Sequence, residues 1–325
     1  MKDGTGLPVL VIFGPTASGK TALAAELFSS ACDSLSDSAY GRFRGRAEII
    51  SADSMQVYRG MDIGTAKPDA AFLATLPHHL VNIRNPDEQF CAGDFVRLAD
   101  ISCKDILARG NLPVVLGGTG FYIKNFLYGL PETPQSDPTL RQSLLDRLKC
   151  EGAASLMREL ADVDPESAKR IHINDEYRIV RALEVFHSSG RPLASFALSG
   201  QYRSGFRFCV IALERDRAEL NNRINQRVDA MFDAGLEGEF HSLVAAGYGP
   251  TSPGMQAIGY REFFSAANAD DLREAIKNDS RKYAKRQETF IRPMPGVIHV
   301  NAEDTGAVYR AILAFFDDTG FFSTS

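Results

Sequence analysis

Tryptophan is absent from this 325-residue chain, and cysteine is scarce. None of the five cysteines belongs to a C-x-x-C pair or has a histidine nearby, so their spacing does not indicate a zinc site. Scattered thiols are typical of a reducing compartment, where disulfides rarely form. A chain of this length can bury a sufficient core without disulfides or a structural metal. The sequence therefore predicts a globular protein that an apolar core holds together.

The sequence also lacks a long apolar run near its amino terminus. The run that ends before Gly14 has about seven residues, which is too short to span a bilayer. No signal-peptide cleavage pattern accompanies it, and no internal repeat is visible. We expect a soluble, cytoplasmic protein with no membrane partner.

An overall excess of positive charge is missing too. The net charge is −5 and the isoelectric point about 5.8, which argues against a general nucleic-acid binder. Residues 273–292 are the exception, because they carry seven Lys or Arg side chains against three acidic ones. An acidic protein with such a local basic stripe can still hold one RNA specifically.

Short apolar segments alternate with amphipathic ones over the first part of the chain. They predict strands at 9–13, 48–51 and 113–116 and helices at 21–28 and 93–109, with a surface loop at 29–46. Alternation of this kind is typical of a parallel sheet with helices on both faces. We predict an α/β fold with a doubly wound parallel sheet.

The pattern changes after the turn-rich segment 129–138. Helical stretches are expected at 140–149, 153–160, 165–171 and 176–188, and no buried strand is expected between them. The sheet resumes at 206–213, long helices follow at 217–235, 237–246 and 270–292, and a last strand is expected at 297–300. We therefore predict a core domain of residues 1–132 and 206–325 and an inserted all-helical module of residues 133–205.

A phosphate-binding motif follows the first predicted strand. Residues 14–21 match G-x-x-x-x-G-K-[ST] and are Gly14, Pro15, Thr16, Ala17, Ser18, Gly19, Lys20 and Thr21. Backbone N–H groups of such a loop surround an oxyanion, the lysine adds a full positive charge, and the Thr hydroxyl can bind Mg²⁺. The motif predicts a polyphosphate ligand, and its place between a strand and a helix predicts that the α/β fold has a P-loop NTPase-like parallel sheet flanked by helices. The motif does not say which polyphosphate binds, and the commonest ligands of such loops are ATP and GTP.

Asp53 follows the second predicted strand. Ligands of parallel sheets gather at the carboxyl ends of the strands, so Asp53 should lie near the loop of residues 14–21. An aspartate there can hold Mg²⁺ through water, act as a general base, or cap the following turn. The spacing alone leaves these three roles open.

Further segments carry a family likeness. They are ISADSMQVYRGMDIGTAKP (50–68), PHHLVNI (77–83), GGTGFY (117–122), RIHINDEYRIVRALEVF (170–186) and AKRQETFIR (284–292). Together with GPTASGKT (14–21), they resemble the tRNA dimethylallyltransferase family in that family's order and over almost the whole chain. General P-loop kinases do not share the segments beyond the loop.

The resemblance implies that the loop of residues 14–21 cradles the diphosphate of dimethylallyl diphosphate. Lys20 and Thr21 would hold this diphosphate with Mg²⁺ as the cofactor, and Thr21 would be the metal ligand. Arg223 matches a family arginine that contacts the diphosphate, and Arg227 is the alternative match for that position. Asp53 would take the proton from the N6 amine of an adenine.

The resemblance also implies contacts to tRNA, the macromolecular partner. The implied residues are Asp53, Ser54, Met55, Gln56, Thr119, Arg141, Tyr177, Arg178, Ile179, Val180, Arg181, Met255, Gln256, Ala257, Ile258, Gly259, Tyr260, Lys285, Arg286, Gln287, Glu288, Thr289, Phe290, Ile291 and Arg292. Exposed aromatic side chains near basic ones suit single-stranded RNA, because they stack on unpaired bases.

The implied activity is transfer of a dimethylallyl group to N6 of the adenosine 3′ of the anticodon (position 37) in tRNAs that read codons beginning with U. The enzyme would act as a monomer on the anticodon stem-loop and release diphosphate. Alternatives are an isopentenyltransferase acting on free AMP, ADP or ATP, a small-molecule P-loop kinase, and a non-catalytic RNA-binding protein. The helical module and the basic segment favour tRNA, because a mononucleotide acceptor needs neither.

Overall fold

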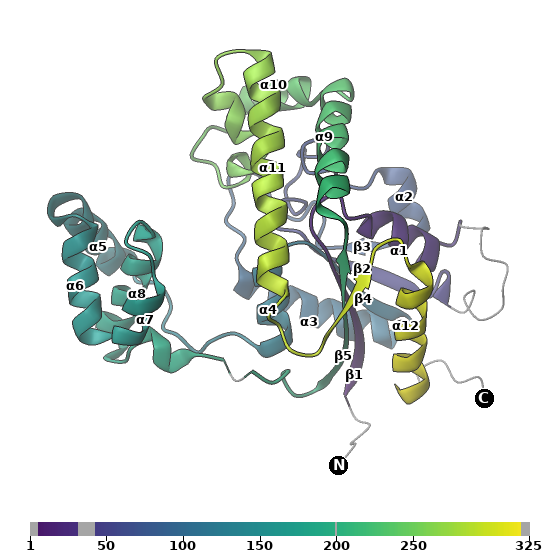
Figure 1. Ribbon diagram of the computed structural model, residues 1–325, viewed down its shortest axis with the longest axis horizontal. Helices are drawn as coiled ribbons and strands as arrows, with labels where there is room; N and C mark the ends of the chain where they lie inside the picture. Colours follow the sequence, from purple (N-terminus) through teal and green to yellow (C-terminus); the bar gives the residue numbers. More distant parts are fainter. Residues whose placement is uncertain (1–5, 32–42, 199, 320–325) are drawn as a thin grey trace. The chain divides into compact units, whose positions relative to one another are not determined.

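The computed structural model describes residues 6–31, 43–198 and 200–319. The chain forms two compact units, one of Met1–Leu127 with Tyr202–Ser325 and one of Tyr128–Gln201 (Figure 1). The sequence pattern predicts an inserted helical module of residues 133–205. No helix of the described residues has both the length and the apolar character that crossing a membrane requires.

A six-stranded sheet forms the centre of the first unit, with strand order β3-β2-β4-β1-β5-β6 and parallel pairing throughout. The strands are β1 (Leu7–Phe13), β2 (Ala47–Ala52), β3 (His78–His79), β4 (Leu112–Gly117), β5 (Phe206–Glu214) and β6 (Val297–Asn301). The central strand β1 is buried over residues 9–13, as its continuous apolar, β-branched run predicts. The predicted α/β class with a P-loop-like parallel sheet is confirmed.

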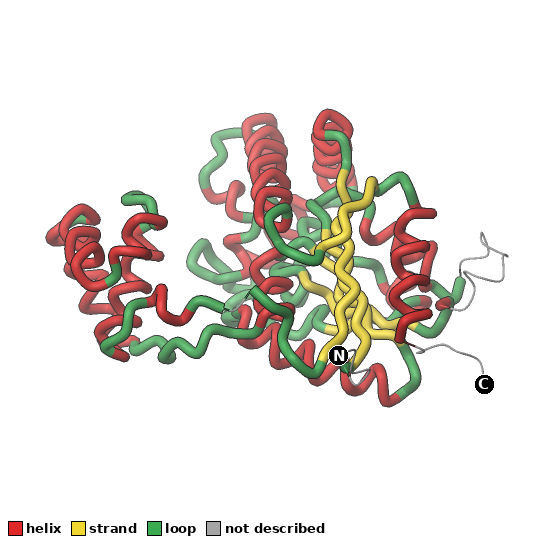
Figure 2. Tube along the Cα trace, turned by 60° about the horizontal axis from the view of Figure 1, so that its bottom comes forward, coloured by secondary structure: helices red, strands yellow, loops and turns green. Residues whose placement is uncertain are grey.

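Helices cover both faces of the sheet (Figures 1 and 2). Successive strand side chains point to opposite faces, and α1 (Lys20–Phe28) and α12 (Thr305–Thr319) pack on the face that presents Leu10 and Ile12. On the other face, α3 (Ala92–Ala108) and α4 (Gly120–Tyr128) meet through stacked rings of Phe95 and Tyr122. The sheet is thus enclosed on both sides, and its carboxyl edge is left for a ligand.

Four further helices complete this unit. They are α2 (Ala70–Thr75), α9 (Arg217–Asp233), α10 (Leu236–Ala245) and α11 (Ala269–Ile291), and the short 3₁₀ turns η3 (Gly254–Gln256) and η4 (Arg261–Phe264) lie between the last two. The two long helices α9 and α11 run side by side (Figure 1).

The second unit consists of α5 (Pro138–Glu151), α6 (Ala153–Val163), α7 (Pro165–Arg170), α8 (Glu176–Ser189) and η2 (Leu193–Phe196). Its described residues contain no strand. Asp137, Asp164 and Asp175 cap the amino termini of α5, α7 and α8 by accepting backbone hydrogen bonds. The unit has its own core around Leu156, Leu160 and Leu183, so these helices bury an apolar face without the sheet.

The sequence pattern missed three elements. β3 has two residues, too few to show a period. α4 begins within a glycine-rich segment that reads as a loop, and α2 has six residues. Of the loop predicted at 29–46, residues 32–42 lie outside the described part of the chain.

Candidate active site

The loop of residues 14–21 joins β1 to α1 at the carboxyl edge of the sheet. Its backbone is constrained, because Gly19 has a φ of 102° and Ala17 a φ of 62°. A non-glycine residue in this left-handed region is uncommon, and such strain clusters at functional sites. A side chain on Gly14 would come within 2.5 Å of Ser18 Oγ. This curled conformation is the one that gathers N–H groups around a phosphate.

Lys20 lies within the curve of the loop. Its Nζ donates hydrogen bonds to the carbonyl oxygens of Gly14 and Pro15, both at 2.7 Å. Burial and the nearby positive charge of Arg227 lower the pKa of Lys20 to about 7, although Asp53 opposes the shift. The hydroxyl of Ser18 is buried and has no hydrogen-bond partner among the described residues. A bound anion would satisfy both groups.

Two arginines of α9 reach the same loop. Arg223 Nε donates to Ala17 O at 2.9 Å, and Arg227 Nη1 donates to Thr16 Oγ1 at 3.4 Å. The sequence offered them as alternatives, and the structure places both beside the loop. Burial, and then repulsion from Arg223, lower the pKa of Arg227. In the described part of the chain, no carboxylate forms an ion pair with Lys20, Arg223 or Arg227.

The packing of α9 explains why both arginines face the loop. Leu220 and Ile224, one turn apart, are buried with Ala17 of the loop and Ala284 of α11. Arg223 and Arg227 have the same spacing, so they follow this apolar stripe along the helix. The loop therefore meets a guanidinium group at two successive turns.

Gln287 attaches α11 to the loop. Its Oε1 accepts a hydrogen bond from Thr16 N at 2.9 Å, and its Nε2 donates to Gly118 O at 2.7 Å. A side chain on Gly118 would overlap Nε2, so only glycine allows this approach. The family resemblance implies that Gln287 contacts RNA. Its bond to the loop joins residues 271 positions apart, and no local spacing could have revealed it.

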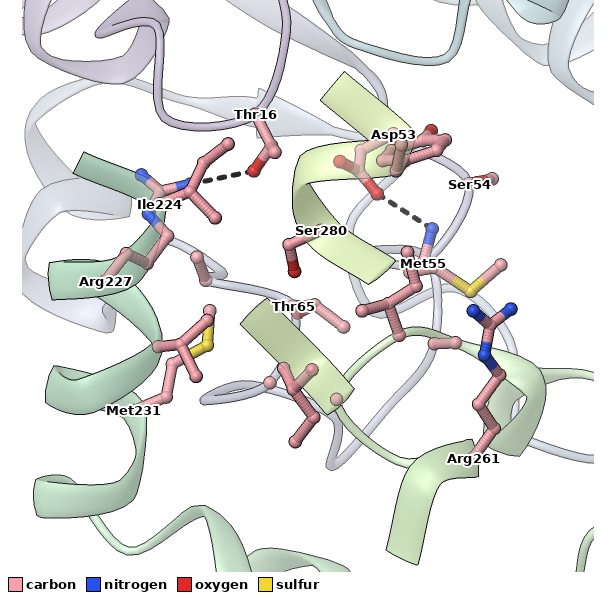
Figure 3. Close-up of a pocket in the computed structure, with 18 of the residues that line it drawn as sticks. Thr16, Asp53, Ser54, Met55, Thr65, Ile224, Arg227, Met231, Arg261 and Ser280 are labelled. Carbon is pink, nitrogen blue, oxygen red and sulfur yellow. Dashed lines mark hydrogen bonds between the residues drawn. The ribbon is translucent and has the colours of Figure 1, made fainter. Parts of the chain in front are cut away.

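A cavity of about 260 Å³ opens beside the loop. Thr16 and Arg227 lie on one side of it and Asp53 on the other (Figure 3). Much of the remaining lining is apolar and comes from α9, α11 and the chain between η3 and η4: Ile224, Val228, Met231, Ile258 and Ile276. Arg261 and Arg286 also belong to the lining. Among the described residues, the cavity thus combines cations, an apolar wall and one carboxylate.

Asp53 follows β2 directly, where the sequence placed it. Its Oδ1 accepts hydrogen bonds from Met55 N at 2.9 Å and from Gln56 N at 3.3 Å. Its second oxygen has no hydrogen-bond partner within the described residues. One oxygen therefore caps the turn, and the other is free to accept a proton in the cavity.

The residues matched to tRNA contacts divide into groups. Those that line the cavity are Asp53, Ser54, Met55, Gln256, Ala257, Ile258, Gly259 and Arg286. Those with exposed side chains elsewhere are Tyr177, Arg178, Lys285, Thr289 and Arg292. Those with buried side chains are Ile179, Val180, Met255, Tyr260, Gln287 and Ile291. Buried side chains support the surface that the exposed ones present.

Four of the remaining matched residues have protein partners. Thr119 Oγ1 accepts a hydrogen bond from Ser54 N at 3.0 Å, and Gln56 Oε1 accepts one from Ser51 Oγ at 3.0 Å. In the second unit, Arg141 and Arg181 both bind the buried carboxylate of Glu184, at 3.3 Å and 2.9 Å. Phe290 lies against Gly120, where an added Cβ would be 2.5 Å from its ring. The half-buried Glu288 completes the set.

The site fits a magnesium ion only if the ion arrives with a phosphate ligand. Among the described residues, no group of three or more His, Cys, Asp or Glu side chains could hold a metal. Mg²⁺ is commonly held by substrate phosphates, water and one or two protein oxygens. The side chain of Thr21, at the start of α1, is exposed and makes no hydrogen bond with described residues. Its hydroxyl is therefore available as such a ligand.

A family model described as IPP transferase matches residues 56–294. The chain belongs to the IPP transferase family. Among its relatives, the tRNA dimethylallyltransferase 1 of Trichlorobacter lovleyi is 43% identical over 314 residues, which are 95% of this chain and 98% of that protein. The tRNA dimethylallyltransferase of Geobacter sulfurreducens is 42% identical and spans 90% of this chain and 92% of its own length.

Solved structures of similar proteins share the fold. The full-length tRNA isopentenylpyrophosphate transferase of Bacillus halodurans matches with a TM-score of 0.66 and 32% identity, over 97% of this chain and 98% of that one. A eukaryotic dimethylallyltransferase acting on tRNA matches with a TM-score of 0.76 and 26% identity, over 96% of this chain and 80% of that one.

The lowered pKa of Lys20 leads to a measurable pH dependence. Because that pKa is about 7 without a ligand, the amine should become nucleophilic as the pH rises through this value. Bound pyrophosphate favours the protonated form, so it should move the onset of reactivity to higher pH. Acylation by a small reagent, followed by mass spectrometry across a pH series, measures this. The exposed Lys149 serves as an internal control that pyrophosphate should not affect. A Lys20 that reacts equally with and without pyrophosphate would contradict the assignment.

Proposed function

We propose that this chain is a tRNA dimethylallyltransferase. It transfers the dimethylallyl group of dimethylallyl diphosphate to N6 of the adenosine 3′ of the anticodon (position 37), in tRNAs that read codons beginning with U. The observation that carries the proposal is the arrangement of one cavity, where a strained cationic loop lies across from a carboxylate with a free oxygen. Membership of the IPP transferase family supports it.

The loop of residues 14–21 and the cations around it stabilise the leaving group, diphosphate. As the bond between C1 of the dimethylallyl group and the diphosphate oxygen breaks, diphosphate departs with the electron pair. Lys20, Arg223, Arg227 and the loop N–H groups stabilise the charge that develops there, and they stand in place before the reaction. Thr21 would hold a Mg²⁺ ion there, and the ion would supply further positive charge for the diphosphate.

Asp53 removes the proton that the acceptor amine loses. The new bond forms between C1 and N6 of the adenine, and N6 then carries one proton too many. The free oxygen of Asp53 accepts this proton, because the adenine amine is too weak a base to keep it. Oδ1 stays bound to Met55 N and Gln56 N, which holds the carboxylate in one orientation.

The apolar wall accounts for the dimethylallyl group. Ile224, Val228 and Met231 of α9 line the cavity, so they can cover the five-carbon chain and keep water away from C1. Water would compete with the amine for the allylic carbon. An adenine in an RNA loop must leave its stack to enter such a cavity, as the targets of base-modifying enzymes do.

The exposed basic side chains account for the RNA. Three basic side chains can neutralise phosphates: Lys285 and Arg286 in the second half of α11 and Arg292 directly after it. In the second unit, the exposed Tyr177 offers an aromatic ring and the exposed Arg178 a positive charge. The enzyme acts as a monomer in the cytoplasm under this proposal. Its partners are dimethylallyl diphosphate and the anticodon stem-loop of tRNA.

The acceptor decides between this proposal and its alternatives. Labelled dimethylallyl diphosphate should transfer its label to unmodified tRNA and not to AMP, and ATP should compete weakly for the site. Liquid chromatography of the digested tRNA identifies the modified nucleoside. Transfer to AMP alone would make the chain an adenylate isopentenyltransferase, and a phosphorylated product from ATP would make it a kinase.

Replacing Asp53 by Asn separates its two roles. The amide oxygen of Asn can still accept hydrogen bonds from Met55 N and Gln56 N, so the turn should persist, but an amide cannot take a proton. A general base contributes about 10²–10⁴-fold to a rate, so we expect Asp53→Asn to lower kcat by that factor while tRNA affinity changes little. Single-turnover kinetics and filter binding measure the two effects. Unchanged turnover would remove Asp53 from the chemistry.

Charge reversal on α11 tests the RNA surface. Lys285→Glu and Arg286→Glu should weaken tRNA binding, and each should make its logarithmic salt dependence shallower by about one unit for every phosphate that is no longer neutralised. Arg310→Glu on α12, where the side chain is exposed, is the matched control and should leave the slope unaltered. If the salt dependence of tRNA binding had the same slope in all three variants, the tRNA would not bind at this surface of α11.

A further inference from the structure

One side of the cavity is formed by the segment of residues 62–66, here termed the wall segment. Gly64, Thr65 and Ala66 line the cavity. The segment belongs to no helix or strand, and Ala66 adopts a φ of 49°. Two backbone hydrogen bonds close the turn, from Ala66 N to Ile63 O and from Lys67 N to Asp62 O. The N–H groups at the start of the segment are left for side chains to bind.

One carboxylate from α10 holds this segment. Glu239 Oε2 accepts hydrogen bonds from Asp62 N and Ile63 N, both at 2.9 Å. Its Oε1 accepts from Ile63 N at 3.1 Å and from Gly64 N at 3.2 Å. Three consecutive amides therefore converge on a single side chain. Such a run of N–H groups forms an anion-binding concavity, and here the protein fills it with its own carboxylate.

Tyr260 locks the carboxylate in place from the other side. Its hydroxyl donates to Glu239 Oε1 at 2.5 Å and accepts from Gly64 N at 3.1 Å. The ring is fully buried, and a side chain on Gly64 would come within 2.5 Å of it. Burial first, and then the neighbouring Glu239, raise the pKa of Tyr260. The hydroxyl thus stays a donor at neutral pH.

The wall segment is connected to Asp53 through one residue. Gln56 Nε2 lies 3.4 Å from the carbonyl oxygens of Thr65 and Ala66. The backbone N–H of the same Gln56 donates to Asp53 Oδ1 at 3.3 Å. A shift of the wall segment would therefore reach the turn that orients Asp53.

We propose that Glu239 is a positioning residue for the transfer reaction: it holds the wall segment, and through Gln56 the turn of Asp53, in the arrangement that the reaction needs. Glu239 does not line the cavity, so it acts through the segment and not on the substrate. The inference rests on the proposed function. It adds a residue of α10, outside the segments that carry the family resemblance.

Glu239→Gln is the test, because it keeps the size of the side chain and exchanges one acceptor oxygen for an NH₂ group that faces N–H donors. Misplacement of catalytic groups by about 1 Å can cost on the order of a hundredfold in rate, so we expect kcat to fall between about tenfold and a hundredfold. The affinity for pyrophosphate should stay the same, because the loop of residues 14–21 is not touched. Glu237→Gln, on the same helix and exposed, is the matched control and should keep full activity.

Amide hydrogen exchange gives a second readout that does not depend on activity. In Glu239→Gln, the amides of residues 62–64 should exchange faster than in the wild type, and in Glu237→Gln they should not. Faster exchange with unchanged kcat would overturn the inference, as would unchanged exchange. If Glu239→Gln does not fold, Tyr260→Phe removes one hydroxyl and should produce the same effects at smaller size. A wild-type protein that fails to prenylate tRNA would instead refute the proposed function.

Discussion

Positive charge without an ion-pair partner is the constraint on which this site depends. Lys20, Arg223 and Arg227 gather around one strained loop, and in the described residues none of them forms an ion pair with a carboxylate, although the charge of Asp53 acts on Lys20 and Arg227. Burying like charges together is unfavourable, and the lowered pKa values of Lys20 and Arg227 express that cost. The three cations stay close together because the surrounding packing fixes the positions of their side chains. Apolar residues of α9 hold the arginines against the loop, and Gln287 ties α11 to it.

The position of Asp53 relative to these cations is the second constraint on the site. An Asp53 paired with Arg227 would compensate the cations, but it would lose its ability to accept a proton, because a nearby cation stabilises the ionised carboxylate. The turn after β2 binds Oδ1 to two backbone amides, and in the described residues Asp53 forms no ion pair with Arg227. The wall segment, held by Glu239, is connected to that turn through Gln56. Under the proposed function, Arg227 and the loop, which stabilise the leaving group, thus lie across one cavity from the carboxylate that serves the acceptor.

The sequence predicted the parts of this site that depend on local order. The loop of residues 14–21 follows from its glycines and its place between a strand and a helix, and Asp53 follows from its position at a strand end. The core strands and the helical module were also predicted, because their apolar patterns are long enough to show a period. Short elements such as β3 escaped, since two residues carry no pattern. Contacts between distant segments escaped as well. Neither the bond of Gln287 to the loop nor the anchoring of residues 62–64 by Glu239 leaves a trace in local spacing.

The uncompensated charge can be tested most directly by thermal unfolding of the wild type and of Arg227→Met over a series of pyrophosphate concentrations. Removing this guanidinium relieves repulsion in the empty site, so the variant should melt at the same temperature as the wild type or higher without an anion. It should then gain less stability from pyrophosphate, because the anion loses one of its partners. A variant that melts lower without an anion and gains as much from pyrophosphate as the wild type would contradict the account.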